Sequence, residues 1–288
     1  MYLIQTIQKF LFDFNIILVV QFLNSLTLKE MLKMAKRPLI LATNDDGINA
    51  PGLKYLVSIV SQIGDVVIVA PDSAKSATSQ AITINSPLYV SKSNYHLKSK
   101  LEYQLSGTPA DCVKFGVNEI LEEKPDLCVS GINHGANSSI NALYSGTIGA
   151  AIEAAIQGVP AVGFSVHDYS WDAKFNHLEK FIKSIILNVL NMKLPTNVVL
   201  NVNFPRSKVK GLKICRQANT HWEENFIKRK NPMGKIYYWL TGDFINNDNS
   251  NETDEYAIKN GYGSIVPIRF DLTAKDYIHE LEKWEFND

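Results

Sequence analysis

Residues 39–52 read LILATNDDGINAPG and combine a short apolar run with two adjacent carboxylates. The run Leu39–Thr43 is nearly continuous in apolar residues, which is typical of a strand buried on both faces. Asp45 and Asp46 follow in a segment with the composition of a turn, and Pro51 fits the first turn of a helix. The stretch therefore predicts a strand, a loop that holds two charges of the same sign, and a helix.

Strand-like and helix-like segments alternate through the first part of the chain. Apolar runs with strand character lie at 38–43, 65–70, 126–131 and 160–166. Apolar residues recur at helical spacing in the segments 51–64, 108–123, 146–158 and 171–193. This alternation predicts an α/β fold with a doubly wound, mostly parallel sheet and right-handed crossovers.

The pattern changes after about residue 195, where short strand-like runs are separated by turns. These runs lie at 197–205, 211–217, 235–244 and 262–268. The polar stretch 246–255 reads as an exposed loop. We expect a β-rich elaboration over about 196–270, followed by a terminal helix over about 273–285.

The composition limits the classes of function. The 288 residues carry 29 Lys plus Arg and 29 Asp plus Glu, so the formal net charge is zero and nothing indicates binding of a nucleic-acid polymer. Cys112, Cys128 and Cys215 lie far apart, which predicts three reduced core thiols rather than disulfides or a zinc site. A cytoplasmic protein is the default expectation.

The N-terminal segment 1–36 reads as an extension that precedes the domain. Residues 10–26 are strongly apolar, but Asp13, Asn15 and Gln21 interrupt them and no signal-peptide features accompany them. We hypothesise that residues 1–33 are dispensable or a start-site artefact, with Met34 as the natural start. A membrane-associated segment is the alternative, and no stable membrane association is expected.

Three polar stretches follow predicted strands, where doubly wound sheets bind their ligands. They are NDDG (44–47), PDSAKSATS (71–79) and SGINHGANSS (130–139). Two ionised carboxylates as close as Asp45 and Asp46 repel each other unless a cation or a proton joins them. Mg²⁺ or Mn²⁺ fits, with Ser76 and Asn133 adding neutral oxygen ligands. Ordinary turn chemistry is the alternative for the two aspartates.

Residues 145–147 indicate an anion site. Ser145, Gly146 and Thr147 lie where a helix is predicted to begin, and free N–H groups at such a terminus can hold a phosphate. Ordinary N-capping is the alternative. A metal beside a phosphate site would favour hydrolysis of phosphoesters.

Other catalytic motifs are missing from the sequence. It contains neither GxxxxGK[ST] nor GxGxxG, and the residues around Ser165 do not match G-x-S-x-G. The six histidines form no metal-binding pair. His134 lies in a candidate loop, but no role is assigned to it.

Nine motifs occur in an order that resembles one family. They are TNDDG, APDSAKSATS, GTPADCV, SGINHGAN, YSGTIGAAIEAA, LNVNFP, RQ, YYWLTGD and GYGSIVPI. On these motifs the sequence closely resembles the SurE family, the stationary-phase survival proteins, over about residues 37–285. The resemblance implies a Rossmann-like α/β core with a β-hairpin extension and a C-terminal segment exchanged between the subunits of a homodimer or homotetramer.

The resemblance also implies an activity and its residues. A SurE-like domain over 37–288 would be a 5′-nucleotidase that hydrolyses nucleoside 5′- and 3′-monophosphates, and some members also trim polyphosphate. The implied ligands of one divalent cation per subunit, Mg²⁺ or Mn²⁺, are Asp45, Asp46, Ser76 and Asn133. The implied phosphate contacts are Ser145, Gly146 and Thr147, supported by Asn44 and Asn137.

We hypothesise that water attacks phosphorus in line and that Asp46, paired with Asp45, handles the proton of that water. Two other classes of function compete with an enzyme. One is a nucleotide sensor that does not hydrolyse its ligand, and the other is a structural or chaperone-like role of an oligomer.

Overall fold

The computed structural model describes residues 36–95, 98–192 and 194–286. Contacts divide the chain into the units Met1–Pro38 and Leu39–Asp288. The hypotheses about residues 1–33 fall outside the described residues. Within the described ranges, no helix combines the length and the apolar character needed to cross a membrane.

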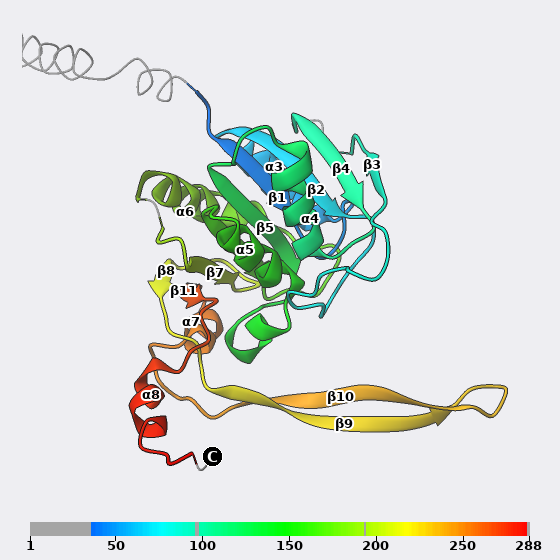
Figure 1. Ribbon diagram of the computed structural model, residues 1–288, viewed down its shortest axis with the longest axis vertical. Helices are drawn as coiled ribbons and strands as arrows, with labels where there is room; N and C mark the ends of the chain where they lie inside the picture. Colours follow the sequence, from blue (N-terminus) through cyan, green and yellow to red (C-terminus); the bar gives the residue numbers. More distant parts are fainter. Residues whose placement is uncertain (1–35, 96–97, 193, 287–288) are drawn as a thin grey trace, which may run out of the picture. The chain divides into compact units, whose positions relative to one another are not determined.

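A nine-stranded sheet lies at the centre of the described part of the unit Leu39–Asp288 (Figure 1). In spatial order its strands are β3 (Val90–Lys92), β4 (Leu101–Leu105), β2 (Asp65–Pro71), β1 (Leu39–Thr43), β5 (Leu127–His134), β6 (Ala161–Val166), β7 (Val198–Phe204), β11 (Gly263–Arg269) and β8 (Leu212–Ile214). The strands from β4 to β7 are parallel, whereas β3 and β11 run antiparallel to their neighbours β4 and β7. The predicted doubly wound, mostly parallel α/β fold is therefore confirmed.

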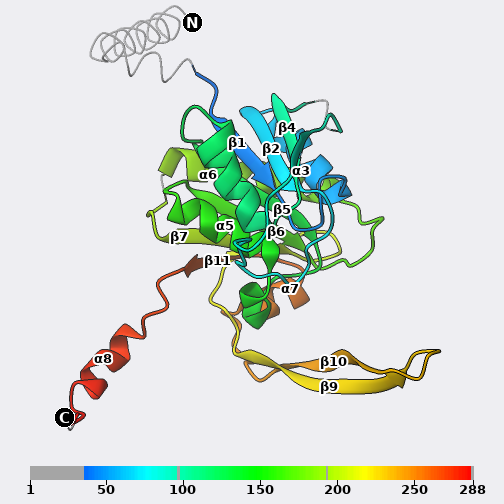
Figure 2. The same ribbon diagram turned by 45° about the vertical axis from the view of Figure 1, so that its right-hand side comes forward.

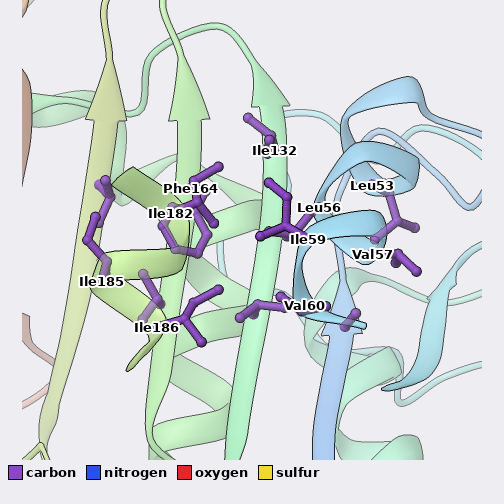
Figure 3. Close-up of a cluster of buried hydrophobic side chains, with 14 of the residues drawn as sticks. Leu53, Leu56, Val57, Ile59, Val60, Ile132, Phe164, Ile182, Ile185 and Ile186 are labelled. Atoms are coloured by element: carbon purple, nitrogen blue, oxygen red, sulfur yellow. The ribbon is translucent and has the colours of Figure 1, made fainter. Parts of the chain in front are cut away.

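Helices cover both faces of this sheet. The helices α3 (Pro51–Val60) and α6 (Glu179–Met192) pack on one face, and α4 (Pro109–Phe115) and α5 (Gly146–Ile156) pack on the other. Figure 3 shows the first of these layers, in which Leu56 of α3, Ile186 of α6 and Phe164 of β6 belong to one cluster of buried side chains. The sheet is thus removed from water on both sides, as expected for parallel strands.

Strand β1 shows why its sequence is continuously apolar. Ile40 and Ala42 belong to the core beneath α3 and α6, whereas Leu39 and Leu41 belong to the core beneath α4 and α5. Successive side chains of a strand point to opposite faces, so a strand buried on both faces needs apolar residues at every position.

Helix α4 starts as local chemistry requires, but helix α6 begins later than predicted. Thr108 and Asp111 form a capping box at α4, which ends at Phe115 and continues as a π-helix over Gly116–Ile120. The predicted helix over 171–193 is wrong at its start, because residues 171–175 form a loop and α6 begins only at Glu179. Tertiary packing overrides the helical pattern there, since Phe175 is buried in the core.

The segment 196–270, expected as a β-rich elaboration, divides into two parts. Strands β7, β8 and β11 belong to the main sheet. Only β9 (Thr220–Lys230) and β10 (Ile236–Asn246) leave it, as a long antiparallel hairpin that projects from the body (Figures 1 and 2). Strand β9 is missing from the predicted elements, because most of its residues are polar or charged and exposed, and the apolar ones follow no strand pattern.

The prediction of an exposed loop over 246–255 is wrong at its C-terminal end. Thr253 is fully buried and caps the helix α7 (Asp254–Lys259). The carboxylate of Asp254 is buried, and it accepts hydrogen bonds from the backbone N–H groups of Ser139 and Ala218, at 2.7 and 3.0 Å, which offset the cost of its burial. By contrast, the terminal helix α8 (Lys275–Leu281) has no buried residue.

The three cysteines agree with the expectation of core thiols. Cys112, Cys128 and Cys215 are buried and form no disulfide. Burial raises the pKa of Cys128 to about 12, so this thiol stays protonated at neutral pH.

Helix α3 approaches strand β5 closely at Gly52, and a substitution there tests this packing. A Cβ atom at Gly52 would lie 2.0 Å from the carbonyl oxygen of Ile132, a backbone atom that cannot move aside cheaply. We expect Gly52→Ala to lower the free energy of unfolding by about 1–3 kcal/mol in urea denaturation. The control is Gly211→Ala, whose Cβ would lie 3.8 Å from its nearest neighbour atom in Tyr262. Equal stabilities of the two variants would contradict this packing.

Candidate functional site

Three polar loops meet at the carboxyl edge of the central strands. Strands β2, β1 and β5 are parallel neighbours in that order, so the loops that follow them lie side by side. The N–H of Lys75, after β2, donates to the carbonyl oxygen of Asp45 at 2.7 Å. The N–H of His134, at the end of β5, donates to Asp46 Oδ2 at 3.2 Å. Both aspartates are therefore tied to the loops that the sequence predicted as their partners.

Asp45 is a buried carboxylate, with 4% of its surface exposed. Its Oδ1 accepts a hydrogen bond from the Thr147 hydroxyl at the start of α5. The pKa of Asp45 is raised to about 6, mainly by burial; the Thr147 hydrogen bond lowers it, and the neighbouring charge of Asp46 contributes to the rise. A nearby cation would favour the ionised form of this group.

Asp46 is half-buried, and its ionised form is also disfavoured. Burial raises its pKa, and the hydrogen bond from the His134 N–H opposes that shift. Because both side chains are carboxylates, neither can neutralise the other. This pair favours a positively charged third group between them.

Buried oxygen atoms without partners lie next to this pair. Thr43 Oγ1, Asn44 Oδ1 and Ser130 Oγ are buried and have no hydrogen-bond partner among the described residues. Thr43 and Ser130 are paired in register across β1 and β5, and Asn44 uses its amide nitrogen to donate to the Gly47 carbonyl at 2.9 Å. Unpaired buried oxygens are costly, so they indicate a polar site that a cation or water completes.

The two neutral ligands of the predicted metal site lie at the same edge. Asn133 is half-buried, and its Nδ2 donates to the Gly135 carbonyl at 2.7 Å, which leaves the oxygen of the same amide as an acceptor. Ser76 is exposed. The next residue, Ala77, has a left-handed backbone with a φ of 56°. No cluster of three or more His, Cys, Asp or Glu occurs within the described ranges. The donors available beside the two carboxylates are therefore hydroxyl and amide oxygens, which suit a hard cation such as Mg²⁺ or Mn²⁺.

The N-terminus of α5 lies against Asp45. Ser145 is its N-cap, and Ser145 Oγ accepts from the N–H of Ile148 at 3.1 Å, so the capping alternative holds for this hydroxyl. A Cβ on Gly146 would lie 2.8 Å from Asp45 Cβ, which shows how closely the helix approaches the carboxylate. The partial positive charge of a helix N-terminus stabilises anions placed there.

Asn137 is almost fully buried, with 8% of its surface exposed, and its contacts hold the loop after β5 in place. Its Nδ2 donates to Ser165 Oγ at 2.8 Å and its N–H donates to Asn203 Oδ1 at 2.7 Å. Its carbonyl oxygen accepts from Asn201 Nδ2 at 2.8 Å. These contacts fasten the loop to β6 and β7.

Three residues of the site were not predicted from the sequence as site residues. Thr43 was predicted only as a strand residue, and Ser130 lay in a predicted polar stretch but received no role, although a polar residue at the carboxyl end of an apolar strand is a usable signal. His134 received no role, and it acts through its backbone N–H, which no sequence motif reveals.

Comparison with known proteins identifies the family. The family model described as "Survival protein SurE" matches residues 40–224. The chain is 58% identical over 254 residues to the 5′-nucleotidase SurE of Flavobacterium psychrophilum, and the match covers 87% of this chain and 99% of that protein. It is 57% identical over 260 residues to the 5′-nucleotidase SurE of Christiangramia forsetii, with 88% and 99% covered.

A solved structure agrees with these matches. The crystal structure of the SurE protein from Aquifex aeolicus superposes with a TM-score of 0.74 at 36% identity and covers 85% of this chain and 98% of that one. The predicted resemblance is confirmed, and the chain belongs to the SurE family.

Proposed function

We propose that this chain is a phosphatase that hydrolyses nucleoside 5′-monophosphates with the help of one divalent cation per subunit. The observation that carries the proposal is the pair Asp45 and Asp46, held at the carboxyl edge of the sheet against the N-terminus of α5. The relatives from F. psychrophilum and C. forsetii are named 5′-nucleotidases, which supports the substrate class. We extend the proposal to nucleoside 3′-monophosphates and, as a lesser substrate, to polyphosphate.

The residues at the site fit the proposed cation. Asp45, Asp46, Ser76 and Asn133 would hold Mg²⁺ or Mn²⁺ through oxygen atoms. When bound, the cation would supply positive charge to the phosphoryl oxygens and lower the pKa of a water molecule. The three buried oxygens of Thr43, Asn44 and Ser130 give the site further polar partners for water.

The protein's own groups have separate roles in the proposed reaction. The N–H groups at the start of α5 would bind the phosphate and orient it. Thr147 fixes Asp45 through its hydroxyl, and the His134 N–H fixes one oxygen of Asp46. Asp46 is our candidate to accept the proton of the attacking water, because it is less buried than Asp45.

We also propose that the subunits assemble into a homodimer or homotetramer. The β9–β10 hairpin exposes large apolar side chains, namely Trp222, Phe226, Tyr237, Tyr238, Trp239 and Leu240. Helix α8 leaves Ile278 and Leu281 exposed, and Trp284 follows them. Apolar surface of this extent is typical of an interface between proteins.

The test of the cation combines a phosphate-release assay with thermal melts. Wild-type protein should release phosphate from AMP with Mn²⁺ or Mg²⁺ and lose this activity with a chelator. At a free metal concentration of about 100 times Kd, the metal should raise the free energy of unfolding of the wild type by about 2.7 kcal/mol. Asp46→Asn should lose most of the metal-dependent activity and most of this stabilisation. With chelator, the same substitution should be neutral or stabilising, because it relieves the repulsion from Asp45.

The control for this test is Asp65→Asn, at the amino end of β2 and thus at the opposite edge of the sheet. It should keep the full metal-dependent shift. Equal shifts in the wild type and Asp46→Asn would remove Asp46 from the set of ligands. Undiminished hydrolysis in chelator would reject metal dependence altogether.

The proposed phosphate site is tested at Gly146. Gly146→Ala places a Cβ 2.8 Å from Asp45 Cβ and 3.0 Å from Thr78 Oγ1, so the carboxylate must shift. We expect kcat/KM for AMP to fall at least about tenfold, since positioning errors at an active site are costly. The far-UV circular dichroism should match that of Gly211→Ala. Wild-type kinetics in Gly146→Ala would show that the phosphate binds elsewhere.

The proposed assembly is tested by two truncations. A deletion from residue 257 would remove β11 from the sheet, so the tail should be cut after it, at residue 271. The hairpin should be replaced by a short turn between Thr220 and Asn246, which pair at its base. We expect the mass in light scattering to fall toward that of a 32.3 kDa monomer, lowered by the residues removed. An unchanged oligomer in both variants would contradict the proposed interfaces.

A further inference from the structure

Two aromatic rings stand exposed on the loop that follows β6. Tyr169 is 73% exposed and Trp171 is 58% exposed, and both belong to residues 167–175, here called the aromatic loop. The predicted start of helix α6 fell within this loop. Neither ring has a role in the reaction described above.

Trp171 is connected to the carboxylate pair through a single residue, His134. Its ring stacks on the His134 ring with the centroids 5.4 Å apart and the planes inclined by 19°. The N–H of His134 is the group that donates to Asp46. Phe175 meets the same imidazole edge-on at 5.4 Å, so His134 is held between the aromatic loop and the core.

Tyr169 lies over the next residue of the same loop after β5. A Cβ on Gly135 would come within 2.6 Å of Tyr169 Cε1, so the ring lies directly against this glycine. Gly135 also accepts the hydrogen bond from the side chain of Asn133, one of the proposed metal ligands. The two rings therefore flank two successive residues that border the site.

The aromatic loop is fixed by polar contacts. His134 Nδ1 and the Ser170 carbonyl oxygen are 2.7 Å apart, and the Ser170 N–H donates to Asp168 Oδ1 at 3.1 Å. Asp168 also forms an ion pair with Arg206 at 3.4 Å. A loop held at several points while it presents two large rings to solvent is preorganised for a planar ligand.

We propose that Trp171 and Tyr169 form the subsite for the base of the nucleoside monophosphate. Every nucleobase has a π-face, and aromatic side chains bind bases by stacking. Purines offer the larger face, so the subsite favours purine over pyrimidine nucleotides. This inference rests on the proposed phosphatase function, because the phosphate at the carboxylate pair places the base beside the aromatic loop.

The test compares a substrate that has a base with one that lacks it. Trp171→Ala should raise KM for AMP about 5- to 100-fold and leave KM for ribose 5-phosphate unchanged. Tyr169→Ala should act in the same direction. Trp171→Phe should keep most of the affinity for AMP, because it retains a stacking face. Tyr89→Ala, which removes an exposed tyrosine (72%) next to β3, is the control and should leave both KM values unchanged.

The substrate pair separates stacking from damage to the carboxylates. If loss of Trp171 disturbed Asp46 through His134, both substrates would lose activity equally, and that result would overturn the proposal. Unchanged KM for AMP in both alanine variants would also overturn the proposal, and binding of a protein partner would then be the remaining explanation for the two exposed rings.

The proposed function and the base subsite can fail separately. If wild-type protein releases phosphate from neither substrate, the proposed function fails, and binding then tests the subsite alone. AMP should quench the tryptophan fluorescence of wild type and Tyr89→Ala, but not of Trp171→Ala. Equal quenching in all three proteins would overturn the subsite.

Discussion

The repulsion between two carboxylates that are largely removed from water is the constraint on which the site depends. Asp45 and Asp46 are adjacent in the chain, so their carboxylates stay close to each other. Each receives one donor from a different element, the hydroxyl of Thr147 or the N–H of His134. An anionic substrate alone would be repelled here, which is why our proposal pairs it with a cation.

The topology of the sheet places these donors. Because β2, β1 and β5 are parallel neighbours, three loops that are distant in sequence converge at one edge. The loop after β5 is fastened a second time by the buried carboxylate of Asp254, which accepts the N–H of Ser139. Asp254 also accepts the N–H of Ala218, just before the β9–β10 hairpin, so the base of the hairpin and a loop of the site share one anchor.

The sequence pattern predicted those elements whose formation depends on residues close together in the chain. Strand β1 was predictable because burial on both faces demands apolar residues throughout, and the start of α4 because Thr108 and Asp111 cap it. Strand β9 was not predictable, because an exposed hairpin strand has no buried face and carries no periodic signal. In the site, Asp45 and Asp46 could be found as adjacent charges. The contact of Trp171 with His134 depends on tertiary packing that also suppresses the predicted helix start.

The position of β1 within the sheet has a consequence for synthesis on the ribosome. Among the described residues β1 is the first strand, yet it lies between β2 and β5. Its edge toward β2 can pair soon after both strands emerge, whereas its other edge stays open until Leu127–His134 has left the exit tunnel. During that interval the nascent chain exposes an apolar strand edge of the kind that pairs with other chains. We therefore expect the nascent chain to need protection by chaperones during that interval.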